Sequence, residues 1–220
     1  MKVAVIGAHG KVGRLLLPIL ADRGEHAAGV VRREEQVPLV RSLGAEPVLL
    51  DVEHASTEEI AAALDGFDAV VWSAGAGGGA PERTYAVDRD AAIRSMDAAA
   101  SAGVRRYVMV SWVGSVPEHG VPEDSSFFAY ADAKLAADDH LRGTDLEWTI
   151  LGPGTLTDDD PTGAITVLAD DAETPEGAAS QVSRADVAMV VTQVLRTPGT
   201  VGRFVRFTSG DAPILEVFAE

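Results

Sequence analysis

Short apolar runs alternate with stretches of helical pattern along most of this 220-residue chain. The runs cover residues 2–7, 26–32, 45–51, 67–75, 104–111 and 146–154. The intervening helices are expected at 11–24, 34–43, 56–64, 81–102 and 126–141. Strands joined through helices run parallel, because a parallel connection needs a crossover of a dozen or more residues. The alternation therefore predicts an α/β fold with a doubly wound parallel sheet.

The alternation weakens after residue 153. Residues 155–177 have the pattern of a loop with a hairpin in it, and they are followed by a helix at 183–198 with Ser183 as its N-cap, a strand at 202–210 and a short terminal helix at 212–220. No internal repeat and no interdomain linker is apparent. We therefore expect a single domain over residues 1–220, with a Rossmann-type core at about 1–153 and a small C-terminal cap at about 154–220.

Composition and charge indicate which kinds of binding partner the protein is expected to lack. The formal net charge is −16, which opposes binding to nucleic-acid phosphates and to anionic membranes, so we expect neither as a partner. Cysteine is absent, which excludes disulfides and thiolate metal sites. No apolar run approaches the roughly 20 residues that cross a bilayer. The opening residues also lack a signal-peptide pattern, so a cytoplasmic location is the expectation.

A glycine-rich loop, "GAHGKVG", connects the first expected strand to the first expected helix. Glycines at this point permit a tight turn and let backbone N–H groups approach a pyrophosphate, whose charge is favoured at a helix N-terminus. The spacing G-x-x-G-x-x-G, directly after a strand and before a helix, indicates a dinucleotide site. We assign to the cofactor the loop residues Gly7, His9, Gly10, Lys11, Val12 and Gly13.

The residues that end the second strand indicate which dinucleotide is bound. An acid there would bind the adenosine ribose hydroxyls, whereas arginine would accept a 2′-phosphate. The strand closes with Arg32 and Arg33, which with Lys11 and Arg14 form a local basic patch in an acidic chain. NADP(H) is therefore the preferred cofactor, with NAD(H) as the other possibility. Arg33 has an alternative role as a solvent-exposed partner of the acids at 34 and 35.

A tyrosine and a lysine lie four residues apart in "YADAK", so Tyr130 and Lys134 share one face of the expected helix. An ammonium near a phenol favours the phenolate and lowers its pKa. Tyr130 could then exchange a proton with a carbonyl oxygen while a nicotinamide exchanges hydride with the carbon. Ser111, at the end of the fifth strand, could hold the same oxygen. The structural alternative packs Tyr130 against the sheet and ties Lys134 to Asp138.

Together, "GAHGKVGR", "LDV", "SAG", "VRRYVMVS", "YADAK" and "WTILGPGTLTD" resemble the short-chain dehydrogenase/reductase superfamily. More narrowly, the chain resembles its atypical, short NAD(P)H-binding branch, which is similar to the extended epimerase/dehydratase members. The resemblance implies that Asp51 and Val52 flank the adenine and that Lys134 contacts the nicotinamide ribose. It also implies that the cofactor is lined after the fourth strand by Ser73, Ala74 and Gly75, and beside the nicotinamide by Pro153 and Gly154.

Three positions depart from the pattern of that branch. His9 replaces a usual threonine and either binds phosphate or points to solvent. Trp112 stands where further serines or threonines are usual, and Gly152 replaces an arginine near the pocket. In addition, only about 70 residues follow the sixth strand, which disfavours a bulky sugar-nucleotide substrate.

Three functions agree with these features. The first is an NADP(H)-dependent oxidoreductase that transfers hydride to or from a small carbonyl, quinone or flavin-like substrate. The second is a catalytically silent NAD(P)H-binding redox sensor or regulator with a protein partner. The third is an NAD-dependent epimerase or dehydratase. We expect no metal site, because the histidines lack ligand spacing and the acidic runs at 158–160 and 169–173 are typical of solvated loops. The alanine-rich helix at 86–102 leaves a monomer or a homodimer open.

Overall fold

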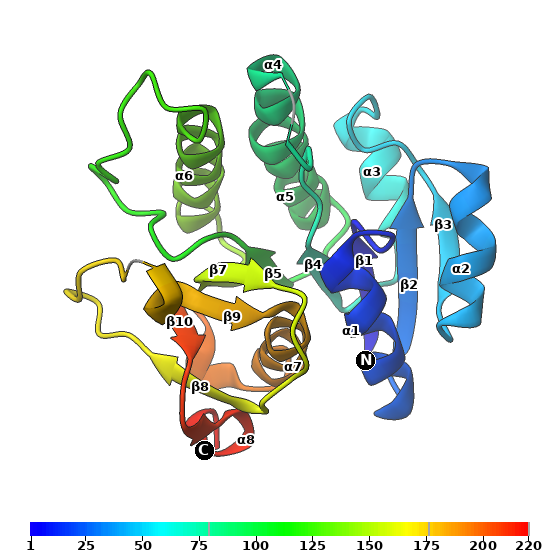
Figure 1. The fold of residues 1–220 in the computed structure, drawn as a ribbon. Coiled ribbons are helices and arrows are strands. Elements are labelled where there is room, and N and C mark those ends of the chain that lie inside the picture. The colour runs from blue at the N-terminus through cyan, green and yellow to red at the C-terminus, as the bar shows by residue number, and fades with distance from the viewer. Residues whose placement is uncertain (79, 176, 220) are drawn as a thin grey trace.

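The computed structural model describes residues 1–78, 80–175 and 177–219, apart from the side chains of 178 and 179. Within this part, nine strands form one sheet in the order β11-β8-β10-β6-β5-β4-β1-β2-β3 (Figure 1). The seven strands from β10 to β3 run parallel, whereas β8 is antiparallel to both β10 and β11. The strand order confirms the predicted doubly wound α/β fold.

The first half of the chain follows the predicted alternation closely. Its elements are β1 (Lys2–Ile6), α1 (Lys11–Asp22), β2 (His26–Val31), α2 (Val37–Ser42), β3 (Glu46–Leu49), α3 (Thr57–Ala63), β4 (Ala69–Trp72), α4 (Pro81–Thr84), α5 (Ala92–Ser101) and β5 (Arg106–Val110). A 3₁₀ turn, η1 (Glu34–Gln36), precedes α2, and a stretch of π-helix, η2 (Tyr85–Ala91), joins α4 to α5.

The second half begins with α6 (Phe128–Arg142) and β6 (Glu147–Pro153). Its remaining elements are β7 (Thr155–Thr157), β8 (Ala164–Val167), η3 (Gly177–Ser180), β9 (Gln181–Ser183), α7 (Arg184–Val194), η4 (Pro198–Thr200), β10 (Arg203–Ser209), β11 (Ala212–Pro213) and α8 (Ile214–Val217). The expected hairpin within 155–177 is wrong, because β7 pairs with β9 in a separate small sheet and β8 pairs with β10 and β11.

Alternate strand residues face two hydrophobic layers. In β1, Val3 and Val5 belong to the layer formed with α1, α2 and α7, whereas Ala4 and Ile6 belong to the layer formed with α3, α5 and α6. This is the period of two that a strand imposes when both faces of its sheet are covered. The central strands are consequently continuous apolar runs, as the sequence pattern predicted.

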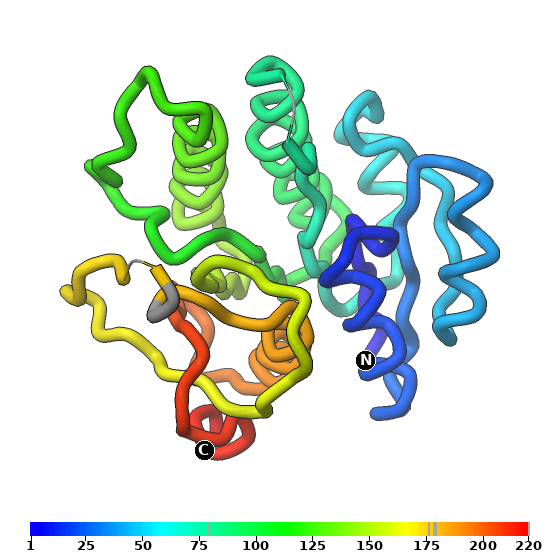
Figure 2. Tube along the Cα trace, viewed as in Figure 1, coloured from blue at the N-terminus to red at the C-terminus, as the bar shows by residue number. Residues whose placement is uncertain are grey.

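Residues after 153 extend the sheet as well as covering its end. Strand β10 pairs along β6, and α7 packs against α1 on the face of the first hydrophobic layer. Figure 2 shows this yellow-to-red part of the chain gathered at one end of the molecule, opposite the blue β2 and β3 segments. The C-terminal residues thus share the core with the N-terminal ones.

Candidate functional site

A cavity of about 700 Å³ lies where the parallel strands reach their carboxyl ends. Ligands of open α/β sheets bind at this edge. Fourteen of the residues predicted from the sequence line it: Gly7, His9, Gly10, Lys11, Val12, Arg32, Asp51, Val52, Ser73, Ala74, Gly75, Ser111, Tyr130 and Lys134. The described wall does not include Gly13, Arg33, Pro153 or Gly154.

Those four residues have other surroundings. Gly13 lies in the first turn of α1, where an added Cβ would meet the Gly7 carbonyl oxygen at 2.6 Å. Arg33 is exposed, and its Nε lies 2.9 Å from Glu35 Oε1, which is the alternative that the sequence left open. At the end of β6, the Pro153 carbonyl accepts a hydrogen bond from Val113, and Gly154 packs against the Ser180 backbone.

The glycine loop is shaped for close backbone approach. Gly7 has φ +88°, and a Cβ there would lie 2.5 Å from the Ala74 nitrogen, so no larger residue fits without a backbone shift. Gly10 N–H donates to the Gly7 carbonyl at 2.8 Å and closes the turn before α1. Backbone that approaches a cavity this closely at a helix N-terminus fits the pyrophosphate of a dinucleotide.

His9 is held by Arg14 in this loop. The Arg14 Nε donates to the His9 carbonyl at 2.8 Å, and the Arg14 Nη2 lies 2.8 Å from His9 Nε2. Partial burial lowers the pKa of His9, and the positive charges of Arg14 and Arg33 lower it further. The imidazole is therefore neutral at pH 7, and a hydrogen bond would be its contribution to phosphate binding.

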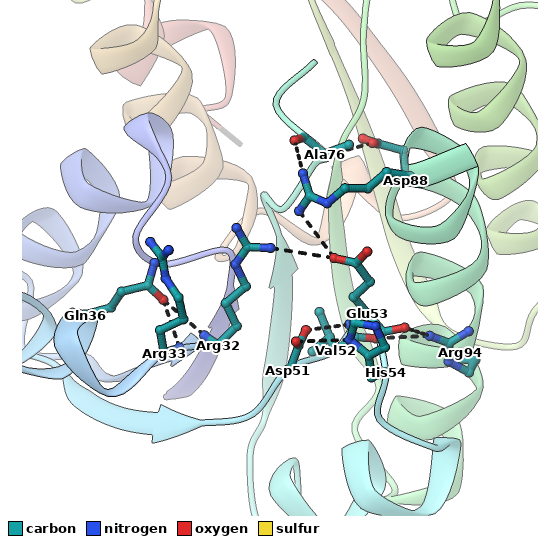
Figure 3. Close-up of polar contacts among 11 residues, drawn as sticks. Arg32, Arg33, Gln36, Asp51, Val52, Glu53, His54, Ala76, Asp88 and Arg94 are labelled. Carbon is teal, nitrogen blue, oxygen red and sulfur yellow. Dashed lines mark hydrogen bonds and ion pairs between the residues drawn. The ribbon is translucent and has the colours of Figure 1, made fainter. Parts of the chain in front are cut away.

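At the end of the cavity that Arg32 lines, Gln36 Oε1 accepts from the backbone N–H groups of Arg32 and Arg33, at 3.2 and 3.1 Å (Figure 3). This fixes the turn that directs Arg32 toward the cavity. Across the cavity, Arg94 donates to the carbonyls of Val52 and Glu53, which holds the segment after β3 in place. The cavity end between these segments is bounded by Arg32 on one side and by Asp51 and Val52 on the other.

An acid that the sequence interpretation did not select lies among these residues. Glu53 Oε2 is 3.6 Å from Arg32 Nη1 and 3.3 Å from Arg83 Nη2. Arg83 also donates to the Ala76 carbonyl at 2.6 Å. This end of the cavity therefore contains a carboxylate shared between two guanidinium groups.

A second unforeseen carboxylate, Asp88, lies in the π-helical stretch η2 and is 2% exposed. Its Oδ2 accepts the Ala76 N–H at 2.9 Å, and a Cβ on Gly75 would come within 2.9 Å of its Oδ1. Burial raises the pKa of Asp88, and the nearby Lys134 and the Ala76 N–H offset part of this effect. The sequence contained one signal that could have identified Asp88. It is an acid that shares the buried face of α4 and η2 with Thr84, Val87 and Ala91.

Tyr130 and Lys134 both reach the cavity, from one face of α6. However, Lys134 Nζ donates to the Val110 carbonyl at 2.9 Å and lies 3.4 Å from Met109 Sδ. Burial raises the pKa of Tyr130, and the negative charges of Asp88 and Asp138 raise it further. The expectation that Lys134 lowers this pKa is therefore wrong for this structure, because the two carboxylates and burial act against the phenolate.

Ser111 also lines the cavity, and its hydroxyl donates to Asp138 Oδ2 at 2.5 Å. Ser115 donates to the same oxygen at 2.6 Å. Asp138 is fully buried, and burial raises its pKa, although Lys134 and the two hydroxyl groups act in the opposite direction. For Ser111 to hold a substrate oxygen, its hydroxyl must turn away from Asp138.

A further ion-pair bridge lies beside the glycine loop and involves two residues that line the cavity, Lys11 and Arg184. Lys11 Nζ lies 2.5 Å from Asp158 Oδ2, and Arg184 Nη1 lies 2.6 Å from Asp158 Oδ1. The sequence interpretation treated Asp158 as part of a solvated acidic loop, and the residue is indeed 63% exposed. Its contact with Lys11 spans 147 positions, so no local pattern indicated it.

Neither a metal site nor a membrane span is found in the described residues. No group of three or more histidine and acidic side chains there is arranged to hold a metal ion. Likewise, none of the described helices has the length and apolar character needed to cross a bilayer.

Comparison with known proteins identifies the family of this chain. The model of the NAD(P)H-binding family matches residues 7–198. The chain is also 38% identical over 218 residues to the uncharacterized sugar epimerase YhfK of Bacillus subtilis, and this alignment covers 98% of each chain. The chain belongs to the NAD(P)H-binding family.

Two solved structures share the whole architecture. One is a protein of Bacillus halodurans, provisionally described as an NAD-dependent epimerase/dehydratase, with 34% identity, a TM-score of 0.88, and coverage of 99% of this chain and 98% of that one. The other is the oxidoreductase ylbE of Lactococcus lactis, with 29% identity, a TM-score of 0.86, and coverage of 99% and 95%. These matches confirm the resemblance to the atypical short branch of the dehydrogenase/reductase superfamily.

Proposed function

We propose that this protein is an NADP(H)-dependent oxidoreductase that reduces a small carbonyl, quinone or flavin-like compound. The observation that supports this most is that one cavity is lined by the glycine loop, by Arg32 and by the cluster of Tyr130, Lys134 and Ser111. The description of ylbE as an oxidoreductase also supports it. When bound, the nicotinamide would supply hydride to the substrate.

The surroundings of Tyr130 favour reduction over oxidation. A phenol with a raised pKa is protonated throughout the neutral range, so a proton donor is always present. In the reducing direction, the Tyr130 hydroxyl would supply the proton that the substrate oxygen gains, because that oxygen becomes a stronger base than a phenolate. Oxidation of an alcohol would need the phenolate as base, and burial beside Asp88 and Asp138 disfavours that form.

Arg32 is the residue proposed to select NADP. Its guanidinium lines the adenosine end of the cavity, while Arg33 is exposed and paired with Glu35. Arg32→Ala should weaken NADP binding by about 1.5–3 kcal/mol through loss of a charge-assisted hydrogen bond, and should leave NAD nearly unchanged. Arg33→Ala is the matched control and should have a much smaller effect. Isothermal titration of both nucleotides would check this, and equal weakening of NADP and NAD by Arg32→Ala would refute it.

A dinucleotide-responsive binding protein is the second candidate. The observation that favours it is the Lys134 ammonium, which is bound to the Val110 carbonyl and does not activate Tyr130. That function predicts tight nucleotide binding without turnover. An epimerase or dehydratase, the third candidate, would show turnover without net consumption of nucleotide.

One experiment separates these functions. NADPH oxidation is measured across a panel of aldehydes, quinones and flavins with native protein, Tyr130→Phe and Tyr85→Phe, the last being a tyrosine of η2 outside the described cavity wall. We expect Tyr130→Phe to lower kcat for aldehydes by about 10²–10⁴-fold, the usual contribution of a general acid, while Tyr85→Phe stays near native. Undiminished aldehyde reduction by Tyr130→Phe would contradict the role given to Tyr130. Binding with no turnover on any compound would favour the second candidate.

A further inference from the structure

Glu53 is an acid that lines the cavity and contacts Arg32. The residue follows Asp51 and Val52 after β3, and its carboxylate faces Arg32, which follows β2 (Figure 3). A single oxygen, Glu53 Oε2, interacts with Arg32 Nη1 at 3.6 Å and with Arg83 Nη2 at 3.3 Å. The acid therefore lies directly beside the arginine proposed to accept a 2′-phosphate.

The position of Glu53 is fixed by its backbone. Its N–H donates to Asp51 Oδ1 at 3.1 Å, and its carbonyl accepts from Arg94 Nη2 at 2.9 Å. The side chain is 16% exposed, whereas the Arg32 side chain is 42% exposed. Arg32 is thus the more exposed partner, and Arg83 also contacts the Glu53 carboxylate independently of Arg32.

We propose that Glu53 is a specificity-determining residue, which sets how strongly the site discriminates between NADP and NAD. This inference rests on the proposed dinucleotide function. A 2′-phosphate carries a charge of about −1.5 to −2 and has to compete with Glu53 for Arg32. A 2′-hydroxyl has no such conflict, because a carboxylate accepts its hydrogen bond. Glu53 accordingly weakens NADP binding relative to NAD binding, and the site accepts both nucleotides.

Replacement of Glu53 by glutamine leaves its neighbours supported. Arg83 retains its hydrogen bond to the Ala76 carbonyl at 2.6 Å, and Ala76 N–H remains bound to Asp88. Glutamine has the same length and keeps an oxygen acceptor, so the substitution removes the charge and little else. Glu82, an exposed residue next to Arg83 at the start of α4, offers a control with the same change in net charge.

Isothermal titration of NADP and of NAD against native protein, Glu53→Gln and Glu82→Gln tests this at 50 mM and 500 mM salt. In Glu53→Gln at 50 mM salt, we expect the NADP dissociation constant to fall about 3- to 5-fold relative to that of NAD, as for loss of a partly exposed charge contact. The gain should shrink at 500 mM salt, where the screening length is only a few ångströms. Glu82→Gln should leave the ratio of the two constants within about two-fold of native.

Two results would overturn the assignment and distinguish it from failure of the proposed function. If both nucleotides bind and Glu53→Gln leaves their ratio unchanged, or Glu82→Gln shifts it equally, then Glu53 has no specific role although the site is a nucleotide site. If the native protein binds neither nucleotide, the dinucleotide function fails and the inference fails with it.

Discussion

Replacement of Gly7 by alanine tests the closest backbone approach in the nucleotide site. Gly7 has φ +88°, and the alanine Cβ would lie 2.5 Å from Ala74 N, 2.6 Å from Ala74 Cα and 2.7 Å from the Ser73 carbonyl carbon. All three atoms belong to backbone, so relief requires the segment after β4 to move away from the loop after β1.

Two free-energy costs add in Gly7→Ala. The left-handed backbone costs an alanine about 1–2 kcal/mol, and overpacking typically costs about 1–3 kcal/mol. Gly24→Ala provides the control for the first cost, because Gly24 has φ +73° and an added Cβ would meet no atom within 4 Å. The difference between the two variants therefore isolates the contact with Ser73 and Ala74.

Urea unfolding at pH 7 measures both variants. We expect Gly7→Ala to lower the free energy of unfolding by about 2–5 kcal/mol and Gly24→Ala by about 1–2 kcal/mol. Because Gly7, Ser73 and Ala74 all line the cavity, Gly7→Ala should also weaken NADPH binding, which Gly24→Ala should not affect. Equal destabilisation by the two substitutions would refute the close approach described for these segments.

Two further predictions concern buried acids outside the nucleotide contacts. Burial raises the pKa of Glu25, but its contacts with the N-terminal amine and Arg196 outweigh burial and lower the pKa. Glu25→Gln should therefore reduce the free energy of unfolding at pH 7. We expect a loss of only about 1–2 kcal/mol, because both cations are partly exposed. The folded pKa of Glu25 lies below the ordinary value of 4.5, so the stabilisation by Glu25 is present above pH 4.5 and is lost as the pH falls through the folded pKa. The free energies of unfolding of native protein and Glu25→Gln, measured by urea titration, should therefore converge in acid. For Asp138 the pH dependence of stability has the opposite sign, because its pKa is raised in the folded protein. The free energy of unfolding should rise as the pH falls from the folded pKa of Asp138 toward 3.8, and Asp138→Asn should lack the part of this rise that Asp138 contributes. Parallel pH profiles for native protein and Asp138→Asn would contradict the second prediction, and a Glu25→Gln deficit that does not shrink as the pH falls below 4.5 would contradict the first.

The features predicted correctly from the sequence are those that depend on local pattern. Residues 2–6, 69–72 and 106–110 are short apolar runs, and they form β1, β4 and β5 because each is covered on both faces. The glycine loop was identified from its place between a strand and a helix. Tyr130 and Lys134 share a face of α6 because they are four residues apart, which is a property of any helix.

The features that the sequence did not reveal depend on contacts between distant segments. The direction of Lys134 Nζ is set by the Val110 carbonyl, and the pKa of Tyr130 is raised first by burial and then by Asp88 and Asp138. Glu53 meets Arg83 across 30 positions. Strand β8 pairs with β10, some 40 residues later in the chain, and for that reason the local pattern suggested a hairpin instead.

A crystal structure of the protein with bound NADP would test most directly whether this cavity binds a dinucleotide in the proposed orientation. We expect the pyrophosphate to lie against Gly7 and Gly10, the 2′-phosphate near Arg32, and the nicotinamide ring on the wall formed by Ser111, Tyr130 and Lys134. A nicotinamide ring at the Arg32 end, or a nucleotide bound outside the cavity, would contradict both the orientation and the function proposed for this site.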